Sequence, residues 1–121
     1  MSTDRAAATR RIRAAVAAHP EMVAGTGRFD TKLMAALGAR IFVKSGAEGV
    51  FCGAIPELGL GIAVKCDDGA GRAAQIATAA LIARFIPQNG DLSILDALSR
   101  PTLTNWNGIT VGDMRPTAAL A

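Results

Sequence analysis

The sequence has no tyrosine, one tryptophan and one histidine, and aromatic residues make up only 4% of it. The basic residues are scattered apart from Arg10, Arg11 and Arg13, which read as the solvated face of a helix. Basic clusters interleaved with aromatic residues are absent, and so is any nucleic-acid-binding motif, so we expect no nucleic-acid partner. The lone histidine, His19, precedes a proline where a helix is expected to end.

Long apolar stretches are also missing. No run of about 18 consecutive apolar residues occurs, which argues against a membrane-spanning helix and a membrane partner. No continuous apolar segment follows the arginines near the N-terminus, so a secretory signal is not expected either. From these patterns we predict a cytoplasmic location.

The two cysteines, Cys52 and Cys66, fall on neighbouring predicted strands. If residues 56–59 form the turn between these strands, the two sulfur atoms are offset by about two or three residues. This offset is roughly 7–10 Å at ~3.3 Å per residue, which is beyond the reach of a disulfide. We therefore predict two free cysteines that act as small apolar residues.

Half of the 121 residues are apolar and the mean hydropathy is +0.30, which indicates a folded chain with a core. We expect a single domain over residues 1–121. Periodicity and turn residues predict helices and strands in an α+β order. The expected helices cover residues 5–18, 30–37, 71–86 and 91–100, and the expected strands cover residues 39–45, 49–55 and 60–66.

The three predicted strands are joined by short connections, which favours an antiparallel meander. Both faces of this sheet look apolar, so we expect helices on both faces. Helix N-caps are expected at Thr3 or Asp4, at Asp30 or Thr31, and at Asp91. Residues 19–28 read as a helix end and a loop, and residues 105–116 as a turn with a possible short strand.

Lys44-Ser45-Gly46 ends the first predicted strand. In serine hydrolases of the penicillin-binding type, a Lys-Ser/Thr-Gly on a strand borders the nucleophile. The lysine there supplies positive charge, the hydroxyl donates a hydrogen bond, and the glycine lets a substrate lie along the strand edge. The alternative interpretation of this short motif is an exposed lysine at the end of a strand.

Three stretches give the motif a wider context: HPEMVAGTGRFDTKLMAAL, VKSGAEGVFCGAIPELGLGIAVKCDDG and NWNGITVGDMRP. Together, in this order, they resemble the L-asparaginase II family, the rhizobial-type or class 3 bacterial asparaginases, from about His19 to Pro116. The region is more distantly similar to glutaminases, in which a Tyr-Asp pair precedes a Lys-Ser-Gly strand. The resemblance implies a β-lactamase/glutaminase-like αβα layered fold and hydrolysis of L-asparagine to L-aspartate and ammonia.

Carried over by position, the resemblance implies that Lys44 is an active-site lysine. It also implies a strand edge along which the substrate lies, formed by Ser45, Gly46 and Ala47. Glu48 reads as an exposed turn residue, and solvation or helix capping accounts for Lys65 and Asp67.

Asp30 falls where the rhizobial branch has an active-site cysteine. The resemblance implies that a carboxylate at this position binds the substrate ammonium or orients a proton-transfer group. Phe29 falls where glutaminases have a tyrosine, and its ring has no hydroxyl to donate a proton or a hydrogen bond.

The sequence departs from the family in lacking a Ser-x-x-Lys, the pair that supplies the activated nucleophile. We therefore interpret the chain as the C-terminal portion of an asparaginase, inactive without a missing N-terminal half. No cofactor is expected in this chain, because the family's zinc site would lie in that half. A partner chain or a homo-oligomer would complete the fold, and a non-catalytic amino-acid-binding module or a degenerate remnant is the alternative.

Overall fold

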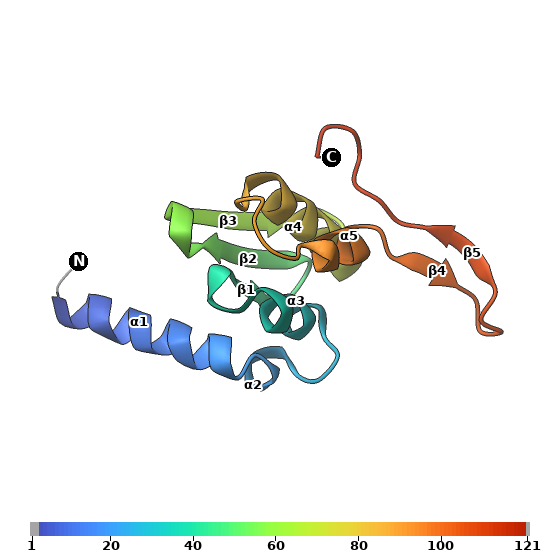
Figure 1. Cartoon of the computed structure of the whole chain (residues 1–121). Coiled ribbons are helices and arrows are strands. Elements are labelled where there is room, and N and C mark those ends of the chain that lie inside the picture. The colour runs from blue at the N-terminus through green and yellow to red at the C-terminus, as the bar shows by residue number, and fades with distance from the viewer. Residues whose placement is uncertain (1–2, 121) are drawn as a thin grey trace.

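The computed structural model describes residues 3–120 (Figure 1). It is an α+β structure, as the sequence predicts, with a three-stranded sheet and a separate two-stranded hairpin. The helices are α1 (Thr3–Ala18), α2 (Glu21–Ala24), α3 (Phe29–Leu37), α4 (Gly71–Phe85) and α5 (Ser93–Ser99). The strands are β1 (Phe42–Ser45), β2 (Val50–Ile55), β3 (Leu60–Lys65), β4 (Thr102–Thr104) and β5 (Thr110–Asp113), and 3₁₀ turns cover Gly38–Arg40 (η1) and Pro56–Leu58 (η2).

The predicted antiparallel meander is confirmed, with the strand order β1-β2-β3. Cys52 lies opposite Ala63, and the N–H of Cys66 donates to the carbonyl of Gly49 at 3.0 Å. Because side chains alternate along a strand, this register points Cys52 and Cys66 to opposite faces of the sheet. Both cysteines are free, as predicted.

Two predictions are wrong at the N-terminal side of the sheet. Residues 39–41 were expected to begin the first strand, but η1 occupies most of this stretch and β1 starts only at Phe42. The cause is Gly38, which ends α3 at a positive φ of 57° and turns the chain tightly before it can extend. In the predicted loop over residues 19–28, the short helix α2 forms after Pro20, whose ring favours a helix start.

The predicted helix caps also differ from the structure. Thr3 and Asp4 lie inside the first turn of α1, and Asp30 and Thr31 lie inside α3, whose N-cap is Arg28. At α5 the N-cap is Leu92, but the carboxylate of Asp91 accepts a hydrogen bond from the Ser93 N–H at 2.9 Å. This bond lowers the pKa of Asp91.

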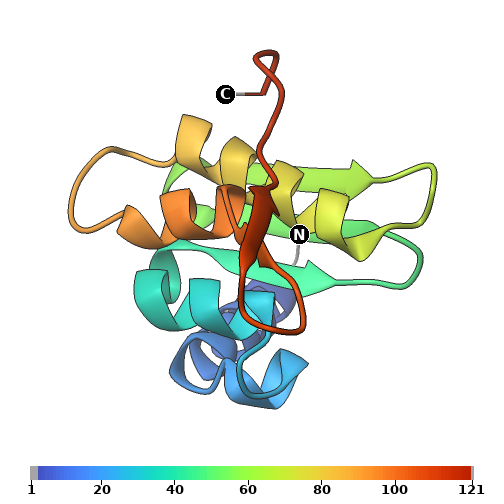
Figure 2. The same ribbon diagram turned by 90° about the vertical axis from the view of Figure 1, so that its right-hand side faces the viewer.

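Helices α3, α4 and α5 cover one face of the sheet (Figures 1 and 2). Val43, Phe51 and Ile55 point from the strands into this layer, where they join Leu33 of α3 and Ile82 of α4 in one core. Helix α4 packs against the sheet and also against α5, which accounts for the apolar character predicted around most of its circumference. Its buried positions are Ala74, Ile76, Thr78, Ala79, Ala80 and Ile82.

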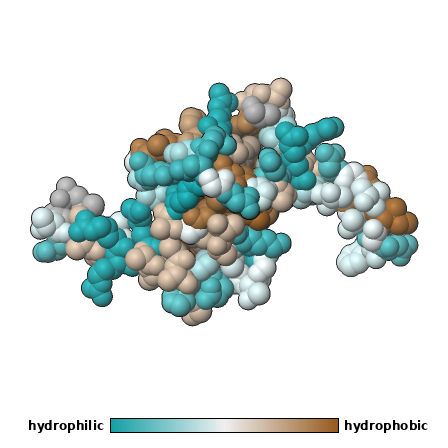
Figure 3. All heavy atoms as spheres, viewed as in Figure 1, coloured by the Kyte–Doolittle hydropathy of each residue, from teal (hydrophilic) through white to brown (hydrophobic). Residues whose placement is uncertain are grey.

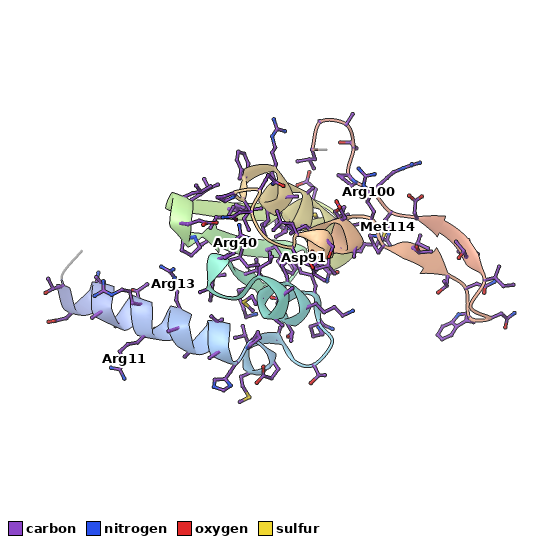
Figure 4. The ribbon with its side chains drawn as sticks, in the orientation of Figure 1. Arg11, Arg13, Arg40, Asp91, Arg100 and Met114 are labelled. Carbon is purple, nitrogen blue, oxygen red and sulfur yellow. The ribbon has the colours of Figure 1, made fainter. Side chains whose placement is uncertain are left out.

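The opposite face of the sheet is largely open within residues 3–120, so the expectation of helices on both faces is wrong. Lys44, Cys52 and Ala63 form a row across the three strands on this face, and all three are exposed. The main contacts of helix α1 are with η1 and β1, and it has no buried residue; its Arg11 and Arg13 are exposed (Figure 4). No helix in the described part of the chain is long and apolar enough to cross a membrane.

The hairpin β4–β5 extends away from the helices and sheet (Figure 1). In its turn, the side-chain oxygen of Asn105 accepts hydrogen bonds from the N–H groups of Asn107 and Ile109 at 3.0 Å. Trp106 is fully exposed at the tip, and apolar side chains gather there on the surface (Figure 3). The sequence predicted only one possible strand here, because the three-residue β4 is too short to show a pattern.

Candidate functional site

The predicted site residues gather where β1 ends and the chain turns into β2. Ser45 is the last residue of β1, and Gly46 and Ala47 begin the turn. The Gly46 N–H donates to the carbonyl of Val50 at 2.8 Å, and the Val50 N–H donates to the carbonyl of Ala47 at 3.3 Å. These bonds close a tight turn that holds the Lys-Ser-Gly segment in one conformation.

Position 46 leaves little space for a side chain. A Cβ atom there would lie 3.1 Å from Cβ of Val50, closer than most real Cβ contacts. Glu48, in the same turn, has a positive φ of 57°, which residues other than glycine seldom adopt. The interpretation of Glu48 as an exposed turn residue is confirmed.

Asp30 reaches this strand end from the first turn of α3. Its Oδ1 accepts a hydrogen bond from the Ser45 N–H at 2.7 Å, although the two residues are 15 positions apart. The Asp30 side chain is covered, with the residue only 2% exposed. The structure therefore joins two predicted site residues directly, through a contact that fixes the main chain of Ser45.

Lys44 projects from the open face of the sheet and is exposed. Its Nζ donates to the carbonyl of Ser45 at 2.6 Å. The main chain of Ser45 is thus bound at both polar groups, at the N–H by Asp30 and at the carbonyl by Lys44. The Lys44 ammonium has three N–H donors, so two of them stay available to a ligand while the bond to the Ser45 carbonyl is kept.

Phe29 is buried beside Asp30. Its ring packs edge-on against Phe51 of β2, with ring centroids 5.2 Å apart and planes at 83°. This T-shaped contact ties the start of α3 to the sheet. The ring adds packing at this position and no hydrogen-bonding group.

Sequence reasoning missed the contribution of Lys65. Its Nζ donates to the carbonyls of Glu48 at 2.7 Å and of Cys66 at 2.6 Å. Lys65 therefore fastens the turn after β1 to the end of β3, whereas the sequence suggested only a solvated side chain. The signal available in the sequence was the position of Lys65 at a strand end, which does not reveal a contact 17 residues away.

Gly49 closes the other side of the turn and is buried at a φ of +70°. A Cβ atom at this position would lie 2.8 Å from the carbonyl carbon of Gly69, in the segment that leads into α4. The end of β1 is thus in contact with two helix starts, α3 through Asp30 and α4 through Gly69. In the part of the chain that the structure describes, no group of three or more His, Cys, Asp or Glu residues is placed to hold a metal ion.

We expect Asp30→Ala to lower the free energy of unfolding by about 2 kcal/mol, because a charged hydrogen bond is lost and a buried N–H is left unpaired. Urea denaturation followed by circular dichroism measures this change. Asp68→Ala is the matched control, since its exposed carboxylate accepts from the Ala70 N–H at 2.9 Å. Equal losses in the two variants would contradict a special structural role for Asp30.

The fold and this strand end define an α+β protein that presents a Lys-Ser-Gly motif at the edge of an antiparallel sheet. The family model for L-asparaginase II matches residues 1–116. The chain therefore belongs to the L-asparaginase II family, a family of amidohydrolases, as the sequence resemblance predicted. No curated protein sequence matches the chain.

Proposed function

We propose that this chain forms one wall of an amidohydrolase site that converts L-asparagine to L-aspartate and ammonia. The observation that carries the proposal is the Asp30–Ser45 hydrogen bond, which fixes the Lys-Ser-Gly strand end within a chain of this family. In the proposed site, Lys44 is the active-site lysine. Ser45, Gly46 and Ala47 form the edge along which the substrate lies.

In this proposal Lys44 supplies a positive charge on the open face of the sheet, where it can bind a substrate carboxylate or assist proton transfer. Asp30 has a positioning role, because its buried carboxylate is already used by the Ser45 N–H. Burial of Asp30, which is only 2% exposed, disfavours direct contact of its carboxylate with a substrate ammonium. We therefore propose that Asp30 supports the strand from its buried side, and that Lys44 faces the substrate from the open side of the sheet.

The nucleophile is proposed to come from outside this chain. None of its serines is followed by a lysine three residues later, and Ser45 is followed at that offset by Glu48. Attack on an amide needs a hydroxyl next to a base. We propose that residues 1–121 act as a single domain, the C-terminal portion of a β-lactamase-like fold, and are inactive alone.

The proposed partner is a second polypeptide segment or a second copy of the chain. The exposed row of Lys44, Cys52 and Ala63 supports this proposal, because it lies on the face of the sheet that no helix covers. We propose the cytoplasm as the location, in keeping with two free thiols. Any zinc site of the family is proposed to lie in the partner segment, because Cys52 and Cys66 point to opposite faces here.

The test is ammonia release from L-asparagine, measured for the chain alone and for the chain co-expressed with any polypeptide encoded directly upstream that carries Ser-x-x-Lys. We expect no turnover alone, turnover in the combination, and a loss of at least about 100-fold on Lys44→Ala, the range typical of a proton-transfer or charge-stabilising group. Arg11→Ala is the control, since Arg11 is an exposed basic residue of α1 outside the proposed site.

Turnover that survives Lys44→Ala unchanged would overturn the role of Lys44. Binding of L-asparagine with no ammonia release in any combination would favour the alternative, an amino-acid-binding module without catalysis. The absence of both binding and turnover would favour a degenerate remnant.

A further inference from the structure

A hollow of about 320 Å³ lies between the N-terminal ends of α3 and α4, away from Lys44. Both helix starts lie on the same side of the molecule (Figure 2). Leu98 of α5, Pro101 and Met114 close the hollow where the hairpin leaves the body, and Figure 4 shows Met114 at this junction. Its volume is at the lower end of the range for small-molecule sites.

The charges around the hollow are all of one sign. Arg28, Lys32 and Arg72 line it, together with the amide of Gln75, and no aspartate or glutamate does so. Among residues 3–120, none of these three cationic side chains makes an ion pair or hydrogen bond with another residue. Arg40 provides the contrast, because it binds the carbonyls of Pro87 and Asn89 and the carboxylate of Glu57.

The backbone adds to this positive potential. Arg28 is the N-cap of α3 and Arg72 is the second residue of α4, so both helices begin at the hollow. Neither N-cap side chain makes a capping hydrogen bond, although at α4 the N–H of the N-cap residue Ala70 donates to the Asp68 carboxylate at 2.9 Å. The remaining N–H groups at a helix start favour an anion, particularly beside cationic side chains.

From these three features we infer a binding site for a phosphate-bearing small molecule, separate from the proposed amidohydrolase site. The phosphate group lies between Arg28, Lys32 and Arg72, where guanidinium groups can bind its oxygens in pairs. Leu98, Pro101 and Met114 form an apolar wall that can contact an organic part of the ligand. Free inorganic phosphates and organic phosphate esters share the chemistry that the cations recognise.

The test is isothermal titration calorimetry on the complete chain at constant ionic strength, with inorganic pyrophosphate and phenyl phosphate as probes. We expect saturable 1:1 binding of at least one probe. Lys32→Gln and Arg72→Gln should each weaken this binding about tenfold, the loss of one charge-assisted contact. Arg11→Gln is the matched control, because it removes the same charge from an exposed position on α1, and it should change the affinity less than about twofold.

Tighter binding of phenyl phosphate would assign the site to organic phosphates, and tighter binding of pyrophosphate would assign it to inorganic ones. The inference is wrong if neither probe binds saturably, or if Arg11→Gln weakens binding as much as the pocket variants. Because all three altered residues are exposed and make no side-chain ion pair, their melting temperatures should match that of the unaltered chain. This comparison separates a loss of binding from a loss of fold.

Discussion

Replacing Ile82 by aspartate is expected to abolish cooperative folding of the chain. Ile82 is completely buried in α4, between the sheet and α5. The substitution removes an aliphatic side chain from the core and places an unpaired carboxylate in the same space. Truncation alone costs about 2–5 kcal/mol, and an unpaired buried charge adds further cost. The sum is comparable to the whole stability of a small domain, which is about 5–15 kcal/mol.

Thermal unfolding followed by circular dichroism measures this effect, and we expect the variant to show no cooperative transition. Ala73→Asp is the matched control, since Ala73 is exposed on the first turn of the same helix. A carboxylate near a helix N-terminus is tolerated or slightly stabilising. A cooperative transition in Ile82→Asp close to that of the unaltered chain would show that α4 is not buried as described.

Gly49→Ala is the second change with a large expected effect, a loss of about 3 kcal/mol in the free energy of unfolding. A residue with a Cβ costs roughly 1–2 kcal/mol in the left-handed region, and overlap in a packed site adds about 1–3 kcal/mol. The overlap is with backbone, because the new Cβ would lie 2.8 Å from the carbonyl carbon of Gly69. Backbone cannot rotate away as a flexible side chain can, so the β1–β2 turn or the start of α4 has to move.

Chemical denaturation measures the Gly49→Ala loss against Gly61→Ala. Gly61 lies in β3 and does not have a positive φ, and a Cβ added there would meet no atom within 4 Å, so alanine should be tolerated. Equal stability of the two variants would contradict the close approach of the turn to Gly69. Because Gly49 also closes the turn that carries Ser45 and Gly46, we expect its variant to impair the Lys44 site in any active assembly.

These predictions connect the fold to the proposed function. The Lys44 strand end is held by Asp30 from α3, by Lys65 from β3 and by the contact of Gly49 with Gly69. Each of these contacts joins segments that are distant in the sequence. Rigid support of this kind is what a site needs if a lysine is to meet a substrate in a fixed geometry.

The candidate site was predicted from the sequence, and the structure adds how one of its residues, Asp30, is bound. Lys44, Ser45, Gly46 and Ala47 were placed together by their adjacency in the chain, and family resemblance added Asp30. The resemblance suggested that the Asp30 carboxylate binds the substrate ammonium or orients a proton-transfer group, and the structure shows this carboxylate covered and bound to the Ser45 N–H. Burial could not be read from the position of Asp30 in a helix pattern, because it depends on how α3 packs against β1.

Local patterns along the chain were enough to predict the α+β class, the meander and the apolar helix α4, because these depend on periodicity and on turn residues such as Gly38 and Gly59. They were also enough to predict that Cys52 and Cys66 do not form a disulfide, since the register of the strands follows from the turn between them.

Packing in three dimensions leaves one face of the sheet open and lets Lys65 fasten the β1–β2 turn, and neither feature has a local signal in the sequence. Packing also brings Arg28, Lys32 and Arg72 around one hollow, because residues from α3 and α4 meet only when the helices pack on the sheet.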